Sequence, residues 1–167
     1  QHGRIESIIH RAPDSSVNSR FDYSYNDDGQ PSAVSTSDGD WSYQYDLGGQ
    51  LTRALFASTN AAIANQDLSY QYDRVGNRIR TVINSESTDY VINEMNQYTA
   101  LGATQFSYDS DGNLVGQSDA TESREYVYDA LNRLVEVTTD AGTWQYEYDA
   151  FGHRNAIVVN GQRREFL

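Results

Sequence analysis

The 167-residue sequence contains no cysteine, which excludes a disulfide framework and a thiolate metal site. Proline occurs only twice, so long stretches of the chain are free to form uninterrupted β-sheet. Basic residues are also few: 12 Lys and Arg stand against 24 Asp and Glu, for a formal charge of −12. That balance argues against nucleic acid and against an anionic membrane surface, because both require a basic footprint.

Long hydrophobic runs are missing as well. No stretch approaches the roughly 20 apolar residues of a membrane-spanning helix, so no membrane span is expected. Residues 1–4 lack the apolar core of a signal peptide, and the chain does not begin with methionine. We therefore expect the chain to be a segment of a longer protein.

Tyrosine, by contrast, is abundant: it occurs 13 times, and most copies fall in one recurring motif. The motif is aromatic-x-Tyr-Asp-x-x-Gly and appears seven times, with its second aromatic position at 25, 45, 72, 92, 108, 128 and 148. The steps between copies are 20, 27, 20, 16, 20 and 20 residues, so an eighth copy is expected just beyond the last residue. Such a period is the signature of a repeat architecture.

The two aromatic residues of each copy are two positions apart, which places them on one face of a β-strand. The residues between them are mostly polar, and this alternation is typical of a half-buried antiparallel strand. We expect cross-strand aromatic pairs, each contributing about 0.2–1 kcal/mol. The predicted structural aromatic ladder consists of Tyr23, Tyr25, Tyr43, Tyr45, Tyr70, Tyr72, Tyr90, Phe106, Tyr108, Tyr126, Tyr128, Tyr146 and Tyr148.

A hairpin turn is expected directly after each aromatic pair. The next residue is always Asp or Asn, whose side chain can bond to backbone N–H groups further along a type I turn. Three residues later the chain always carries Gly or Asn, the residues that tolerate positive φ in a G1 bulge. The predicted turn residues are Asn26, Gly29, Asp46, Gly49, Asp73, Gly76, Asn93, Asn96, Asp109, Gly112, Asp129, Asn132, Asp149 and Gly152.

Apolar or β-branched residues follow each turn and are expected to form the return strands, which end in second turns such as Asn160-Gly161. The chain should therefore be an all-β antiparallel meander of roughly 14 strands. A strongly twisted open sheet seldom exceeds about 10 strands without curling, so we predict a curled strip, part of a β-shell wall.

Three segments are predicted along the chain. Residues 1–20 should hold a return strand and a linker, and residues 21–167 the seven hairpins, cut in mid-repeat. Residues 52–67 hold seven extra residues, rich in Ala and Asn, and should form a longer inserted loop, with a helical turn as an option. The copy around residues 90–98 is weaker and should have a shorter return strand.

The copies resemble the YD repeat of the Rhs family, which also occurs in Tc toxin B and C components and in teneurins. Tyr108-Asp109-Ser-Asp-Gly112-Asn113-Leu114 and Tyr128-Asp129-Ala-Leu-Asn132-Arg133-Leu134 are similar to its consensus, and the resemblance extends from about Arg4 to the end. It implies a hollow β-cocoon that encloses a C-terminal toxin, or an adhesion scaffold. The Asp-Pro-x-Gly segment that ends an Rhs core is absent, so self-cleavage is not carried over.

Catalytic and metal sites are not predicted. His2, His10 and His153 lie outside any nucleophile motif, and the carboxylate pairs Asp27-Asp28 and Asp109/Asp111 fall in turns. The stretch from Asp109 to Asn113 resembles the start of an EF-hand loop, but Leu114 and Ala120 occupy the positions where glycine and glutamate are needed.

We therefore expect a structural shell segment without enzymatic activity, cofactor or metal, in an exported or cell-surface parent protein. Its expected partners are further repeats of the parent chain and an enclosed toxin or other cargo. A carbohydrate-binding or adhesion surface is the alternative, which requires a groove of unpaired tyrosines with a glycan as ligand. A third option is a repeat protein that self-associates through its edge strands.

Overall fold

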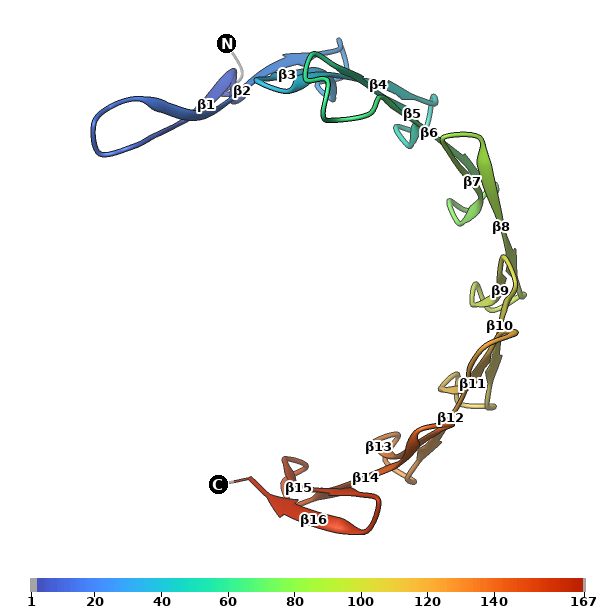
Figure 1. Cartoon of the computed structure of the whole chain (residues 1–167). Helices are drawn as coiled ribbons and strands as arrows, with labels where there is room; N and C mark the ends of the chain where they lie inside the picture. The colour runs from blue at the N-terminus through green and yellow to red at the C-terminus, as the bar shows by residue number, and fades with distance from the viewer. Residues whose placement is uncertain (1–2, 167) are drawn as a thin grey trace. The chain divides into compact units, whose positions relative to one another are not determined.

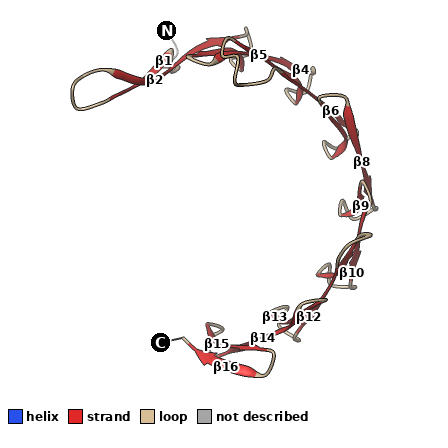
Figure 2. Ribbon diagram, in the orientation of Figure 1, coloured by secondary structure: helices blue, strands red, loops and turns tan. Residues whose placement is uncertain are grey.

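The computed structural model describes residues 3–166, and within them all regular secondary structure is β-strand (Figure 2). The chain divides into two compact units, residues 1–89 and 90–167. The strands of the first unit are β1 (Ser7–Arg11), β2 (Val17–Tyr25), β3 (Pro31–Thr36), β4 (Gly39–Tyr45), β5 (Leu51–Ser58), β6 (Gln66–Tyr72), β7 (Arg78–Ile83) and most of β8 (Glu86–Ile92).

The second unit begins at Tyr90 in the last part of β8. It continues with β9 (Tyr98–Leu101), β10 (Thr104–Tyr108), β11 (Leu114–Ser118), β12 (Ser123–Tyr128), β13 (Leu134–Thr139), β14 (Gly142–Tyr148), β15 (Arg154–Val159) and β16 (Gln162–Glu165). In each unit every strand pairs antiparallel with the next strand of the chain. Each unit is therefore a meander, and Figure 1 shows each as a curved strip one layer thick.

The strand number exceeds the expected 14 because both ends of the repeat array add a strand. The seven motif copies account for β2 to β15. Residues before the first copy form β1, which pairs with β2, and residues after the Asn160-Gly161 turn form β16, which pairs with β15. The segment 1–20 thus contains β1 and the first residues of β2, which begins at Val17.

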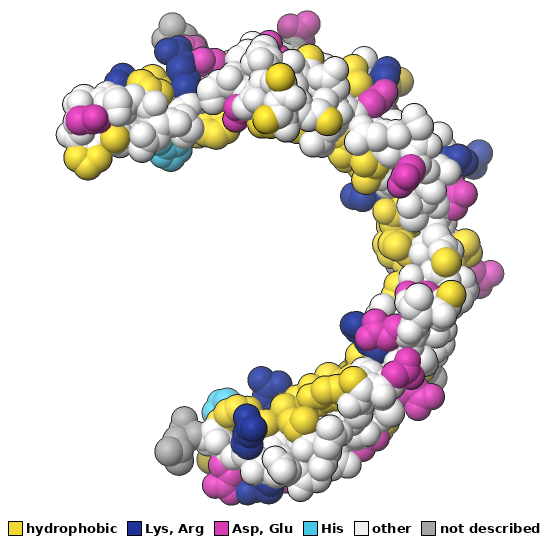
Figure 3. All heavy atoms as spheres, viewed as in Figure 1, with side chains coloured by type: hydrophobic (Ala, Val, Ile, Leu, Met, Phe, Trp, Pro, Cys, Tyr) yellow, Lys and Arg dark blue, Asp and Glu magenta, His cyan; other side chains and the backbone are white. Residues whose placement is uncertain are grey.

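The two faces of each strip differ in chemistry. Aromatic motif residues alternate with exposed, mostly polar ones along most motif strands, as in β4, where Trp41, Tyr43 and Tyr45 are half-buried and Ser42 and Gln44 are exposed. Figure 3 shows hydrophobic side chains gathered along the concave side of each unit. We call this side of a unit its aromatic face and the other its polar face.

Neither strip has a conventional core. The buried hydrophobic residues among those described are few, and most are small: Val34, Ala54, Phe56, Ala100 and Ala156. The buried polar residue among them is Thr81. A single layer buries its apolar side chains only against neighbours on the same face. Its stability must therefore depend on the backbone ladder, the turns and the contacts between repeats.

The prediction of an inserted loop over residues 52–67 needs correction. Leu51–Ser58 continues as β5, and β6 already begins at Gln66, so the loop covers only residues 59–65 and contains no helix. The extra residues lengthen the strand because Ala54 and Phe56 lie opposite Tyr43 and Trp41 on the aromatic face. At the weaker copy, β9 is only four residues long, in line with the shorter return strand expected there.

Candidate functional site

The recurring structural element of this protein is the motif turn, and its geometry is the same in all seven copies. The N–H of the fourth turn residue donates to the carbonyl of the first, at 3.0 Å for Gly29 to Asn26 and 2.9 Å for Asn132 to Asp129. The fourth residue has positive φ in every copy, from +58° at Asn132 to +94° at Gly76. The pairing register also shifts at the second aromatic residue of each copy, which marks a β-bulge. Each turn therefore reverses the chain within four residues.

The first turn residue holds the turn closed through its side chain. Asp109 Oδ1 accepts hydrogen bonds from the N–H groups of Asp111 at 3.0 Å and Asn113 at 2.8 Å, while Oδ2 accepts one from Asn113 Nδ2 at 3.0 Å. These bonds favour the ionised carboxylate, so the pKa of Asp109 is lowered, first by the Asn113 side chain. The pKa of Asp73 is lowered first by the Asn77 side chain, that of Asp129 by the Arg133 side chain, and that of Asp149 by the backbone N–H of His153.

In three copies the residue after the turn joins one repeat to the next, a role that sequence reasoning missed. Gln30 Nε2 donates to the carbonyl of Gly49 at 2.8 Å, Gln97 Nε2 donates to Gly112 at 3.1 Å, and Asn113 Nδ2 donates to Asn132 Oδ1 at 2.9 Å. The sequence did carry a signal, because this position is Gln or Asn in five of the seven copies. We call these bonds the amide bridges.

In five copies the hydroxyl of the second motif tyrosine forms another bond between repeats. It donates to the carbonyl of a residue at or near the start of the return strand that precedes its own strand and pairs with it. Tyr148 reaches Leu134 in this way at 2.8 Å. The others run from Tyr25 to Ile5, Tyr45 to Pro31, Tyr72 to Leu51 and Tyr108 to Tyr98, at 2.7 to 2.9 Å. In the weaker copy Ile92 takes the tyrosine position and has no hydroxyl to donate.

The aromatic residues do not face one another across neighbouring motif strands, which differs from the expected ladder of cross-strand aromatic pairs. A return strand separates successive motif strands, so Tyr126 lies opposite Val137 and Tyr146 opposite Ile157. Contacts between rings of different strands occur where a return strand supplies the second ring. The ring centres of Trp41 and Phe56 on β5 are 5.0 Å apart, and those of Tyr90 and Tyr98 on β9 are 5.4 Å apart.

Arginine side chains cover several of the tyrosine rings. Arg133 Cζ lies 4.7 Å from the ring centre of Tyr148, and Arg154 Cζ lies 5.3 Å from that of Tyr146 and 5.6 Å from that of Phe166. All three distances fit cation–π stacking. Arg133 also binds Asp129 of its own turn at 2.7 Å, so it connects a turn to the aromatic face.

Comparisons with known proteins fit this repeat geometry. The family model described as RHS Repeat matches residues 108–143 and 128–164, which contain the last two motif copies and most of the copy before them. No curated protein sequence gives a significant match. Residues 108–164 therefore match RHS repeats, and the four earlier copies share their motif and turn geometry, so we call the whole chain the YD-repeat segment.

Solved Tc toxin structures share the fold of the YD-repeat segment. The crystal structure of TcdB2-TccC3 matches with a TM-score of 0.71 over 94% of this chain at 14% identity, and that of TcdB2-TccC3-Cdc42 with 0.71 over 91% at 15% identity. The Photorhabdus luminescens Tc holotoxin pore with a mutated TccC3 matches with 0.70 over 88% at 16% identity. The segment spans about a tenth of these chains, 9–10% of their length.

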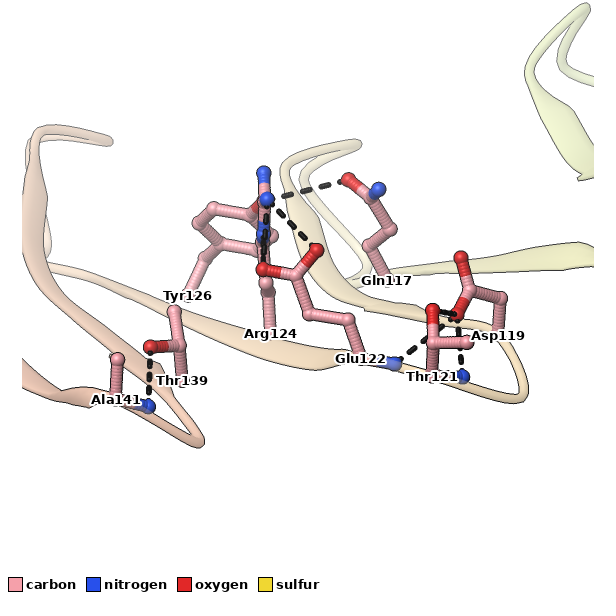
Figure 4. A network of polar contacts seen from close by, with 8 residues as sticks. All are labelled: Gln117, Asp119, Thr121, Glu122, Arg124, Tyr126, Thr139 and Ala141. Carbon is pink, nitrogen blue, oxygen red and sulfur yellow. Dashed lines mark hydrogen bonds and ion pairs between the residues drawn. The ribbon is translucent and has the colours of Figure 1, made fainter.

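A polar cluster interrupts the aromatic face of the YD-repeat segment at β11 and β12 (Figure 4). Glu122 binds Arg124 through both carboxylate oxygens, at 2.7 and 2.9 Å. The Tyr126 hydroxyl lies 3.5 Å from Gln117 Oε1, and Arg124 has a raised pKa, mainly because of its bonds to Glu122. The cluster places hydrogen-bonding groups beside the aromatic side chains of this face.

The described residues bring together no cluster of side chains that could hold a metal ion. Within residues 3–166, no three His, Asp or Glu side chains lie close enough to hold a metal ion, and no helix is long and apolar enough to cross a membrane. His10 packs edge-on against Phe21, while His153 is exposed beside Asp149. His2 lies outside the described residues. Asp27 and Asp28 are exposed in their turn, and Asp111 donates its N–H to Asp109.

Proposed function

We propose that this YD-repeat segment is part of the wall of a shell that encloses a toxin or other cargo polypeptide. The observation that carries the proposal is a single-layer sheet in each unit whose aromatic face has no second layer packed on it among the described residues. An apolar surface of this kind favours contact with another polypeptide over water. The fold shared with Tc toxin chains supports the same conclusion.

The chemistry of the repeats supports a structural role and no enzymatic one. The aspartates at the turns accept hydrogen bonds from backbone N–H groups, and the tyrosine hydroxyls at the ends of the motif strands donate to backbone carbonyls. Polar groups engaged in this way stabilise the wall. The proposed partners are therefore further repeats of a longer parent chain and the cargo that the chain encloses, in an exported protein.

The carbohydrate-binding alternative has weaker support. Sugar rings stack on open aromatic faces, but Arg133 and Arg154 already lie over Tyr148 and Tyr146. Glycan titration followed by tryptophan fluorescence would test it, and saturable quenching would favour that alternative over the shell.

Protease protection tests the shell proposal directly. The longer natural protein that contains this segment would be digested under native conditions, and the release of peptides from its enclosed region followed by mass spectrometry. The control is the same protein with Gly112→Val and Gly152→Val, which disrupts two motif turns. We expect protection in the parent protein and rapid cleavage in the variant. Cleavage in the parent as fast as in the isolated cargo region would refute the proposal.

A further inference from the structure

The two faces of the second unit carry opposite charge, although the whole chain is strongly acidic. The clearest case is β16, where neighbouring arginines point to opposite faces. Arg163 lies opposite Val158 and binds Glu147 at 2.8 Å on the polar face. Arg164 lies opposite Ile157, which itself lies opposite Tyr146, so Arg164 belongs to the aromatic face.

The register of the other strands extends this contrast. Residues between the motif aromatics, such as Glu147, lie on the polar face, and so do the residues opposite them. The aromatic face carries four arginines, of which Arg124 is paired with Glu122 and Arg133 with Asp129, whereas the polar face carries four glutamates and one arginine. The first set is Arg124, Arg133, Arg154 and Arg164, and the second is Glu125, Glu136, Glu147, Glu165 and Arg163.

Two arginines of the aromatic face are available to a ligand. Within residues 3–166 neither Arg154 nor Arg164 forms an ion pair, and both side chains are exposed. Arg154 stacks on the rings of Tyr146 and Phe166. A guanidinium stacked on a ring keeps its N–H groups in its own plane, directed past the ring, where they can bind a carboxylate bidentately. In Figure 3, Arg side chains lie among the hydrophobic ones on the concave side of this unit.

We propose that the aromatic face of the second unit, from β12 to β16, binds an acidic polypeptide segment that also carries apolar side chains. This inference rests on the proposed shell function and names the chemical class of the enclosed segment. Apolar side chains of the ligand would pack against Val137, Trp144 and Ile157, and its carboxylates would bind Arg154 and Arg164. The net charge of the whole chain would by itself favour a basic ligand. The charge of the aromatic face favours an acidic one.

Two synthetic peptides with the same leucines test the proposal, one with glutamates and one with lysines at the remaining positions. Binding of fluorescently labelled peptide to the full chain would be followed by anisotropy at low salt. We expect the glutamate peptide to bind more tightly, against the net charge of −12. Arg164→Gln should weaken its binding about fivefold, the upper end for an exposed ion pair, and Arg164→Lys should restore most of the loss.

Arg163→Gln is the matched control, because it removes the same charge from the same strand but from the polar face. It should change the affinity for the glutamate peptide by less than about twofold, since the carboxylate ligand does not contact that face. Circular dichroism of both variants should match the parent before their affinities are compared. Arg154→Gln offers a second test at a position on a different strand.

Three outcomes would overturn the inference: tighter binding of the lysine peptide, equal effects of Arg163→Gln and Arg164→Gln, or no binding of either peptide. Tighter binding of the lysine peptide would leave the shell proposal standing and reverse only the charge of the cargo. The protease-protection experiment uses the natural protein and neither peptide, so its failure is separate from a failure here.

Discussion

Substituting alanine for Gly152 measures how much free energy the left-handed backbone conformation of a motif turn costs a residue with a side chain. Gly152 has φ +85°, in the left-handed region, and a β-carbon built on it meets no atom within 4 Å. Gly152→Ala therefore introduces no steric clash. Its effect on stability comes from the turn conformation alone.

The magnitude follows from two opposing contributions. A non-glycine residue in the left-handed region costs about 1–2 kcal/mol. Alanine also restricts the unfolded chain, which offsets about 0.4–1 kcal/mol. The net loss in the free energy of unfolding should be about 1 kcal/mol, or about 4–8 °C in Tm for a cooperative unit of 60–100 residues. Gly152→Asn should cost less, because Asn132 occupies the same turn position at φ +58°.

The assay is urea denaturation followed by the fluorescence of Trp144, which lies on β14 just before this turn. A Trp41→Phe background removes the other tryptophan, so that the signal reports on the second unit alone. The comparison is Gly48→Ala in a Trp144→Phe background, where Trp41 on β4 reports on the first unit; Gly48 lies in an equivalent turn, but its φ is not positive. It should be neutral or slightly stabilising.

The reasoning would fail if Gly152→Ala and Gly48→Ala had the same effect on the free energy of unfolding. It would also fail if Gly152→Asn were more costly than Gly152→Ala, because asparagine is the better tolerated residue at positive φ. Either result would mean that the left-handed conformation is not what selects glycine at this position.

Three further predictions concern the bonds between repeats and within turns. Tyr148→Phe removes the hydroxyl that donates to the Leu134 carbonyl and should lower the free energy of unfolding, measured by urea denaturation, by about 1 kcal/mol. Tyr128→Phe should lower it less, because among the described residues Tyr128 makes no bond of this kind. Equal losses would contradict the proposed role of the hydroxyl. Gln97→Ala removes the amide bridge to Gly112 and should speed amide hydrogen exchange in the turn at residues 109–112 while leaving the turn at residues 149–152 unchanged; uniform exchange rates would count against the bridge. The lowered pKa of Asp109 contributes stability that is fully present above the ordinary aspartate pKa of about 4 and is lost as the pH falls through the depressed value. Asp109→Asn, which keeps the accepting oxygen as Asn93 does, should therefore flatten the acid side of the stability profile, and an unchanged profile would refute this.

Bonds between repeats could not be read from single copies of the motif. The sequence placed the second tyrosine of each copy on a strand face, but the carbonyl that its hydroxyl reaches lies 10 to 21 residues away along the chain, as with Tyr108 and Tyr98 or Tyr72 and Leu51. That partner depends on the register in which the strand pairs with the preceding return strand and on the bulge beside each turn. The amide bridge from Gln30 to Gly49 is hidden for the same reason.

What the sequence by itself determined is local. A run of Tyr-Asp-x-x-Gly is enough to indicate where the chain turns, because few residues tolerate the positive φ at Gly112 or Asn132 and because an Asp or Asn side chain closes the turn on its own backbone. The alternation around Tyr126 likewise indicates a strand with two different faces.

Tertiary structure decided what depends on register and on neighbouring strands. It extended β5 to Ser58 because Phe56 finds Trp41 opposite, where the Ala- and Asn-rich composition had indicated a loop. It also separated the adjacent residues Arg163 and Arg164 onto opposite faces, one beside Glu147 and the other beside Ile157. Charge per face is a property of strand pairing, and a net charge of −12 conceals it.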